Sequence, residues 1–212
     1  MASELKVDTI KHTNNTSAIT LDSSGNVTLA GSANNLGTIS AGTLGSSVVF
    51  PAGGTGNPIS VAVIADEKST SNAGGNLGTS FTRRDLNTIL SDSESASGGI
   101  VSISSNQFTL GAGTYLITWS CPAYKVNRHI TQLYDVTSTN VLTEGQTAFS
   151  GSATDEIHSS TGAFVHTISS NNVYEIRQAT QTARSNDGGG LELGGNFTVN
   201  NIYTYVVIYK LK

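Results

Sequence analysis

Histidines and the carboxylates beside them come nearest to a catalytic or metal-binding pattern in this chain. There are four histidines among the 212 residues: His12, His129, His158 and His166. Asp155 and Glu156 precede His158, and side chains of these types can bind a metal ion. Because no second histidine stands at ligand spacing, we interpret this segment as a polar surface loop. We assign neither catalytic nor metal-binding residues.

The stretch from 184 to 195 is the best candidate for contact with a ligand, because it is long, glycine-rich and acidic. Its candidate contact residues are Arg184, Asn186, Asp187 and Glu192. Their groups suit a sugar hydroxyl or a Ca²⁺ ion, and Ca²⁺ is the one cofactor that the sequence leaves open. The string Ser185–Gly189 is similar to a sialidase Asp-box but lacks the aromatic residue that follows it. An ordinary solvated connection is the alternative interpretation.

Other patterns of enzyme chemistry are missing from the sequence. There is no phosphate-binding G-x-x-x-x-G-K-[ST] loop and no G-x-S-x-G elbow. The 15 acidic residues are scattered, so no pair can be assigned as the carboxylates of a glycosidase. Cys121 is the only cysteine, and among apolar neighbours it is predicted to be a buried small hydrophobic side chain. We therefore expect a protein that is not an enzyme.

Composition argues against several classes of partner. Charged residues make up 12% of the chain, about half the usual share, and the net charge is −4. The nearest approach to a basic cluster is the pair Arg83–Arg84, so we expect no nucleic-acid binding. No apolar run approaches the length of a membrane span, so we expect no membrane insertion. The first residues lack the apolar core of a secretory signal, which predicts synthesis in a cytoplasm.

The segment 1–58 is predicted to be an extended attachment stalk. Between Lys11 and Asp66 its only charged residue is Asp22. Its apolar residues form thin stripes that one copy cannot bury. Three copies around a common axis would join these stripes into one core, and a flexible tail is the alternative. Residues 51–58, PAGGTGNP, are predicted to be a Gly/Pro-rich hinge.

The clearest local structure within this stalk is a predicted hairpin. Ile19 and Leu21 alternate with polar neighbours, and so do Val27 and Leu29. The five residues 22–26 between these pairs, DSSGN, are strong turn formers. The sequence therefore predicts two short antiparallel strands here.

Residues 59–212 are predicted to form a globular, all-β head. Tyr115, Ile117, Trp119 and Cys121 alternate with smaller or polar residues, which is the clearest strand period in the chain. Further strands are predicted within 61–65, 83–91, 101–110, 130–142, 164–168, 173–176 and 202–212. About eight short strands separated by turns are typical of an antiparallel sandwich or jelly roll.

The last predicted strand is apolar on both faces. Strict alternation places one set of side chains together on the first face: Tyr203, Tyr205, Val207, Tyr209 and Leu211. Val206 and Ile208 then lie on the second face. A strand of this kind must be covered on both sides. In a trimer, the neighbouring subunit would provide one of the two covers.

His166 shares its predicted strand face with Phe164 and Ile168. These apolar neighbours indicate a histidine of the core or of a subunit interface. In a trimer it would alternatively be placed to meet its two symmetry mates near the axis, as a pH-sensitive group.

Two parts of the sequence resemble known families. The segment FTLGAGTYLITWSCPAY, residues 108–124, resembles the central strand region of the complement-globular-head and tumour-necrosis-factor-like jelly roll. HTISSNNVYEI and YTYVVIYKL further along resemble later strands of the same fold, so this resemblance covers residues 59–212. Residues 3–54 are similar to the stalks of bacteriophage fibre proteins, especially those of marine and cyanobacterial phages.

These resemblances imply a homotrimeric structural protein of a virion. Residues 1–58 would dock on other virion proteins, and the head 59–212 would recognise a host-surface glycan or protein. A capsid decoration or head-fibre protein that stabilises the shell is the main alternative, since 212 residues is short for a primary tail fibre. A polysaccharide-degrading virion enzyme is a further alternative.

Overall fold

The structure of the protein is a computed structural model. It describes residues 9–11, 17–21, 23–24, 27–29, 59–194 and 197–211. The chain divides into two units, Met1–Val49 and Phe50–Lys212, which are described separately. The predicted hinge at 51–58 lies outside the described residues, so the proposed boundary at residue 58 stays a prediction.

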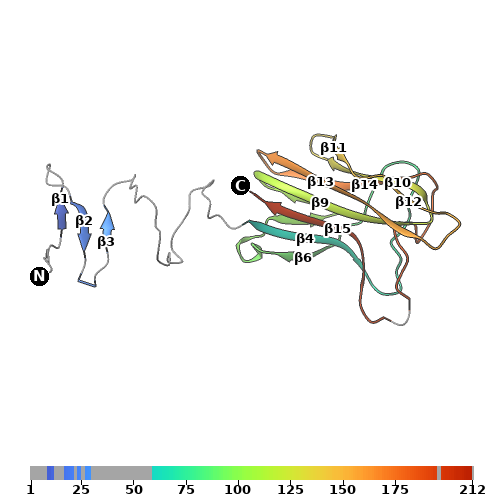
Figure 1. Cartoon of the computed structure of the whole chain (residues 1–212), viewed down its shortest axis with the longest axis horizontal. Helices are drawn as coiled ribbons and strands as arrows, with labels where there is room; N and C mark the ends of the chain where they lie inside the picture. Colours follow the sequence, from blue (N-terminus) through green and yellow to red (C-terminus); the bar gives the residue numbers. More distant parts are fainter. Residues whose placement is uncertain are drawn as a thin grey trace, which may run out of the picture. The chain divides into compact units, whose positions relative to one another are not determined.

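The N-terminal unit contains a small antiparallel sheet. Its strands are β1 (Thr9–Lys11), β2 (Ser17–Leu21) and β3 (Val27–Leu29), in the order β1-β2-β3 (Figure 1). Ile19 pairs with Leu29 and Leu21 with Val27, around a turn at Ser23 and Ser24. This register confirms the predicted hairpin, while the predicted apolar pieces from Leu36 to Phe50 lie outside the described residues.

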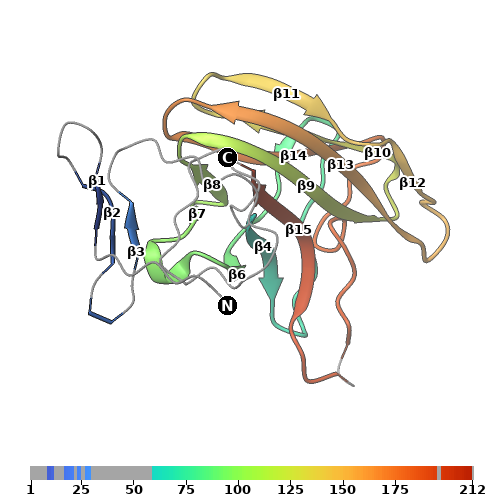
Figure 2. The ribbon, with the colours of Figure 1, turned by 60° about the vertical axis from the view of Figure 1, so that its left-hand side comes forward.

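The head consists of two antiparallel sheets (Figures 1 and 2). The first sheet has the order β13-β9-β15-β4-β6. Its strands are β4 (Ser60–Lys68), β6 (Thr88–Asp92), β9 (Gly113–Tyr124), β13 (Ile157–Ile168) and β15 (Asn201–Lys210). Figure 2 shows β13, β9, β15 and β4 following one another in this layer.

The second sheet has the order β11-β10-β14-β8-β7, with β12 added beside β10 and β5 beside β14. Its strands are β5 (Thr82–Arg83), β7 (Val101–Ser104), β8 (Gln107–Leu110), β10 (Asn127–Asp135), β11 (Asn140–Glu144), β12 (Ala148–Ser150) and β14 (Asn172–Thr180). The only helical element in the described part of the head is one 3₁₀ turn, Ser95–Ser97. Within the described residues, no helix is long and apolar enough to cross a membrane.

The chain passes repeatedly from one sheet to the other. It runs from β4 across to β5, back to β6, and across to β7 and β8. It then returns to β9, crosses to β10, β11 and β12, returns to β13, crosses to β14, and ends in β15. The last strand thereby lies between the first long strand, β4, and the central strand, β9. This order of two antiparallel sheets is a jelly roll, which confirms the predicted fold class.

Alternate side chains of the long strands fill the space between the sheets. Tyr115, Ile117, Trp119 and Cys121 of β9 are all buried, as the alternation predicted, and Cys121 is a free thiol. They pack in one apolar core with side chains of the facing sheet, including Phe108, Leu110, Leu133, Tyr174 and Ile176.

Trp119 also links the two sheets through a polar contact. Its indole Nε1 donates a hydrogen bond to Thr131 Oγ1 on β10, at 2.8 Å. The Ser160 hydroxyl on β13 lies 2.8 Å from the same Thr131 oxygen and donates to the Gln146 carbonyl. Gly162 on β13 pairs with Trp119 and leaves room for its ring. These buried polar groups therefore have partners, as burial requires.

The prediction of one strand across residues 83–91 is wrong. Thr82–Arg83 belongs to the second sheet and Thr88–Asp92 to the first, so the chain crosses between sheets here. Arg84 is buried at the crossing, where its Nε donates to Thr204 Oγ1. Leu86 is buried as expected for an apolar residue, whereas Ile89 and Leu90 are exposed.

Strict alternation is also wrong at the start of β15. Ile202 pairs with Glu67 and Tyr205 with Ala65, so Tyr203 and Thr204 together stand opposite Asp66 in a bulge. Both residues are buried, and the Tyr203 hydroxyl donates to the Asn72 carbonyl. Tyr203 therefore does not share the face of Tyr205.

We predict that Gly162→Ala destabilises the head by about 1–3 kcal/mol, because the added Cβ overlaps the Trp119 ring and forces it to move. The measurement is urea unfolding followed by circular dichroism. Gly78→Ala is the matched control, because a Cβ there meets open space. Equal unfolding midpoints for the two variants would contradict the tight packing of Trp119 against β13.

Candidate functional site

The face of the first sheet that points away from the core is apolar and bears few charges. We call this set of residues the outer face: Val61, Val63, Ala65, Leu116, Thr118, Ser120, Ala163, Val165, Tyr205, Val207 and Tyr209. They alternate along their strands with core residues such as Ile117 and Ile208. None of them is charged.

Some side chains of the outer face are exposed in the described head, whereas Ala65 is fully buried. Val165 on β13 is 58% exposed and Tyr205 on β15 is 39% exposed. Register places Val207 beside Thr118 and Val63, so the apolar surface runs across neighbouring strands. This confirms the prediction that the last strand is apolar on both faces. Contiguous apolar surface of this kind is typical of sites of association.

A second feature is a polar hollow between two loops, one following β4 and one preceding β15. Its volume is about 540 Å³. We call it the polar hollow, and it is lined by Lys68, Ser71, Asn72, Ala73, Gly75, Asn76, Asn186 and Glu192. Two of the predicted contact residues, Asn186 and Glu192, are thus brought together. Their partners from the loop after β4 were not predicted.

The other two predicted contact residues, Arg184 and Asp187, pair with each other outside the lining of the polar hollow. Arg184 donates from Nε and Nη2 to the two Asp187 carboxylate oxygens, at 2.6 and 2.7 Å. Its guanidinium also lies 4.7 Å from the centre of the Tyr124 ring. The hydrogen bonds from Arg184 hold the pKa of Asp187 below its ordinary value. This pair shapes the loop and keeps its own charges balanced.

Backbone hydrogen bonds hold the two loops together. Gly74 N–H donates to the Gly190 carbonyl and Gly75 N–H to the Asn186 carbonyl, both at 2.8 Å. Leu77 and Arg184 exchange two more bonds, each 2.9 Å long. A Cβ at Gly74 would collide with the backbone of the facing loop, so glycine is required for this close approach.

Buried charged groups support the floor of these loops. Arg84 Nη2 donates to the Gly189 carbonyl at 3.0 Å. The Asp66 carboxyl is fully buried, which raises its pKa, and Lys68 Nζ lies 3.1 Å from its Oδ1. Lys68 also donates to Asp85 Oδ2 at 2.6 Å. The positive charge of Lys68 is therefore balanced by two carboxyl groups.

Cys121 has no nucleophilic character in this fold. It lies in the core, and burial raises the pKa of its thiol to about 12. A thiol with that pKa stays protonated near neutral pH, whereas the reactive form is the thiolate. The prediction of a buried small side chain is confirmed.

The structure places His166 apart from His129 and His158, which both contact the Ser150 hydroxyl. His166 lies between the sheets, with ring centroids 5.8 Å from Phe164 and 5.9 Å from Tyr174, so it belongs to the core side of β13. This placement favours the core interpretation over a meeting of symmetry mates. His158 is exposed beside Ile157, and His12 lies outside the described residues. Among the described residues, no group of three or more His, Cys, Asp or Glu could hold a metal ion.

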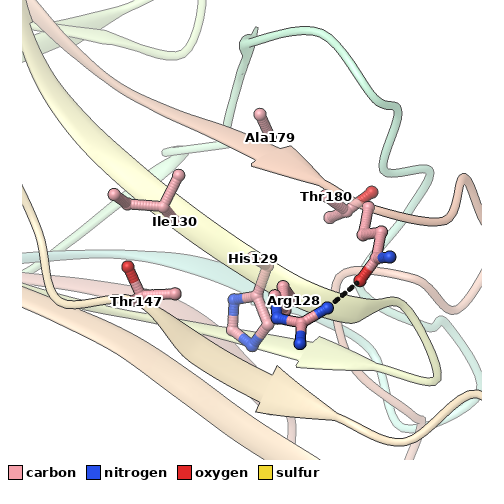
Figure 3. A pocket seen from close by; sticks show the side chains of 7 residues that line it. Arg128, His129, Ile130, Thr147, Ala179 and Thr180 are labelled. Atoms are coloured by element: carbon pink, nitrogen blue, oxygen red, sulfur yellow. Dashed lines mark hydrogen bonds between the residues drawn. The ribbon is translucent and has the colours of Figure 1, made fainter.

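His129 is buried beneath a smaller hollow of about 330 Å³ (Figure 3). Its Nδ1 accepts a hydrogen bond from Gln178 Nε2 at 3.0 Å, and its Nε2 lies 3.4 Å from Ser150 Oγ. Burial lowers the pKa of His129 to about 4, so the ring is neutral near pH 7. At the rim, Arg128 donates to Gln181 (Figure 3). We assign no chemistry to this hollow.

No protein-family model and no curated protein matches this chain. Solved structures with a similar shape include murine APRIL at pH 5.0, with 10% identity, a TM-score of 0.45, and coverage of 73% of this chain and 100% of that one. The globular domain of zebrafish complement 1qA has 16% identity, a TM-score of 0.43, and coverage of 73% and 98%. Eiger TNF from S. frugiperda has 11% identity, a TM-score of 0.49, and coverage of 74% and 94%. The jelly-roll assignment depends on the strand order of this chain, and no property of these proteins is carried over.

We predict that His129 makes the head lose stability as the pH falls from 6.5 to about 4. In that window the unfolded chain binds a proton at this histidine and the native chain does not, so acid favours unfolding. The loss is at most about 3 kcal/mol, and His129→Gln should remove most of it.

The measurement is the free energy of unfolding in urea at the two ends of this pH window. His158→Gln, at an exposed position, is the matched control and should keep most of the acid-induced loss. Retention of the full loss in His129→Gln would assign it to other groups.

Proposed function

We propose that the chain is a non-enzymatic structural protein that assembles as a homotrimer through the outer face. In this proposal it is a bacteriophage fibre or similar virion appendage. Residues 1–58 dock on other virion proteins, and the head 59–212 contacts the host surface. The observation that carries the proposal is the uncharged, largely apolar outer face of the first sheet, on which Val165 and Tyr205 are exposed.

The outer face supports self-association for two reasons: some of its apolar side chains are exposed in the described head, and none of its residues is charged. Exposed Val165 and Tyr205 leave apolar area in water, which burial against another copy would remove. The absence of charge among the outer-face residues means that burial would strand no unpaired ion. The described residues therefore support the interface, and the sequence resemblance to trimeric fibre and jelly-roll families supports the number three.

The N-terminal unit supports the stalk part of the proposal. Its strands β1, β2 and β3 are three to five residues long. A sheet this small has little core of its own and gains stability by sharing one with other copies. The resemblance of residues 3–54 to phage fibre stalks supplies the expected setting, a virion assembled in a host cytoplasm.

The lack of enzymatic activity is supported by how the potentially reactive groups are used. The Cys121 thiol is protonated and buried, and the His129 ring is neutral and buried. The Asp187 carboxylate is paired with Arg184. If incubation with host capsule released oligosaccharides, this part of the proposal would be wrong.

A capsid decoration protein is the second candidate function. It would use the same outer face and the same stalk. Immunogold labelling of virions distinguishes the two candidates: labelled tails support a fibre, and labelled capsid faces support decoration. Free protein should reduce phage adsorption only in the first case.

We predict that Val165→Asp combined with Tyr205→Asp converts the protein to a folded monomer, because a desolvated carboxylate costs several kcal/mol at an interface. Light scattering should give three times the chain mass of 21.9 kDa for the unchanged protein and 21.9 kDa for the variant. Phe149→Asp is the matched control, since Phe149 is exposed but lies on β12, outside the outer face. A monomeric mass for the unchanged protein would overturn the proposed assembly.

We also predict that deletion of residues 1–58 leaves a folded β-domain that no longer attaches to the particle. The head has its own core between the two sheets, so circular dichroism should keep its strand signal. The measurement of attachment is incorporation of the truncated chain into virions made in its presence. Incorporation at the level of the full chain would disprove the docking role.

A further inference from the structure

Several polar side chains around the polar hollow have no partner within the part of the chain that the structure describes. The Ser71 hydroxyl, the Asn186 side-chain amide and the Glu192 carboxylate form no hydrogen bond there. Asn76 uses its Oδ1 to accept from the Asn186 backbone N–H at 2.6 Å, which leaves its NH₂ group for a ligand. The lining thus offers hydroxyl, amide and carboxylate groups together, as both donors and acceptors.

The charge of the lining favours a neutral ligand. Lys68 is balanced by Asp66 and Asp85, so it adds little attraction for a phosphate or another anion. Glu192 is exposed, and no described residue forms an ion pair with it. An acidic ligand would be repelled by this carboxylate, whereas a neutral hydroxyl group would donate a hydrogen bond to it.

The same residues are poorly suited to a cation. Ca²⁺ takes about 6–8 oxygen ligands and in proteins draws them largely from carboxylates. Glu192 is the only carboxylate in the lining of the polar hollow. One carboxylate with amide and hydroxyl groups is a better match for the hydroxyl groups of a sugar.

The polar hollow is held in shape by the backbone before any ligand arrives. Gly75 and Asn186 adopt left-handed conformations, with φ of 87° and 67°, and are joined by the hydrogen bond from Gly75 N–H to the Asn186 carbonyl. The Asn186 N–H is in turn held by Asn76. A lining fixed in this way reduces the entropy lost when a ligand binds. Its volume of about 540 Å³ lies in the range of small-molecule sites.

We propose that the polar hollow is a binding site for a neutral oligosaccharide, held by Ser71, Asn76, Asn186 and Glu192. This inference deepens the proposed host-surface contact of the head by naming the ligand class, and it rests on that part of the proposed function. It does not require the trimer. Recognition uses hydrogen bonds to sugar hydroxyl groups, with the Glu192 carboxylate as the strongest acceptor.

The experiment is saturation-transfer NMR on the full chain with neutral trisaccharides of glucose, galactose, mannose and N-acetylglucosamine, and with a sialylated trisaccharide. At least one neutral sugar is expected to bind in the micromolar to millimolar range, and the sialylated one more weakly. Calcium chloride alone is the comparison for a cation site. Absence of binding by all the neutral sugars would overturn the proposal.

Variants locate the binding. Glu192→Ala should weaken it about tenfold, because one charge-assisted hydrogen bond is lost. Ser71→Trp should abolish it by filling the polar hollow. Glu144→Ala, at an exposed position on β11, is the matched control and should bind as the unchanged protein does. Thermal melts check that each variant is folded.

Three further outcomes would contradict the saccharide site. Sugar binding that survives Ser71→Trp would place the site elsewhere on the head. Saturable calcium binding that is lost in Glu192→Ala, without sugar binding, would make the polar hollow a cation site. Capture of a host protein through Ser71, with no sugar bound, would make it a protein contact.

The failure of this inference can be told apart from the failure of the proposed function. A trimer on the virion that binds no sugar would overturn only the saccharide site. A monomer that binds sugar at Glu192 would overturn the trimer and leave the saccharide site standing.

Discussion

Both faces of the β13-β9-β15-β4-β6 sheet are largely apolar, and within the described head the second sheet covers only one of them. Strand β15 shows the constraint most directly: Val206 and Ile208 enter the core, while Val207 and Tyr209 point the other way. The second sheet covers the first face, and the proposed self-association would cover the other. The chain has only 12% charged residues, and a low content of charge is consistent with burial of both faces of this sheet.

Several of the charged side chains fix loops. The buried Arg84 donates a hydrogen bond to the Gly189 carbonyl, and Arg184 donates to the Asp187 carboxylate. Lys125 Nζ lies 2.5 Å from Asp155 Oδ1. Several of these pairs are local or partly buried, which makes them structural rather than available to a ligand. The sheets therefore depend on apolar packing, and the loops depend on a few ion pairs and on glycine backbones.

Sequence patterns predicted the parts of the head that follow a simple period. The alternation in β9 and in the second half of β15 identified core and outer residues correctly. The bulge at Tyr203 and Thr204 and the crossing at Arg84 break the period through contacts with distant residues, which no local pattern contains. The candidate loop was predicted from its glycines and acidic groups. Asn76 was missed because its bond to Asn186 joins positions 110 residues apart.

The two loops around the polar hollow are joined by backbone hydrogen bonds, whereas the groups that could contact a ligand are side chains. Gly74 and Gly189 cannot change without moving the loops, because their neighbours leave no room for a side chain. Ser71, Asn186 and Glu192 project from the same scaffold into solvent, where substitutions usually alter stability little. A lineage carrying this head can therefore explore new surface chemistry at three positions while inheriting an unchanged frame. Host range, on this view, would evolve by replacement of a few exposed side chains rather than by redesign of the fold.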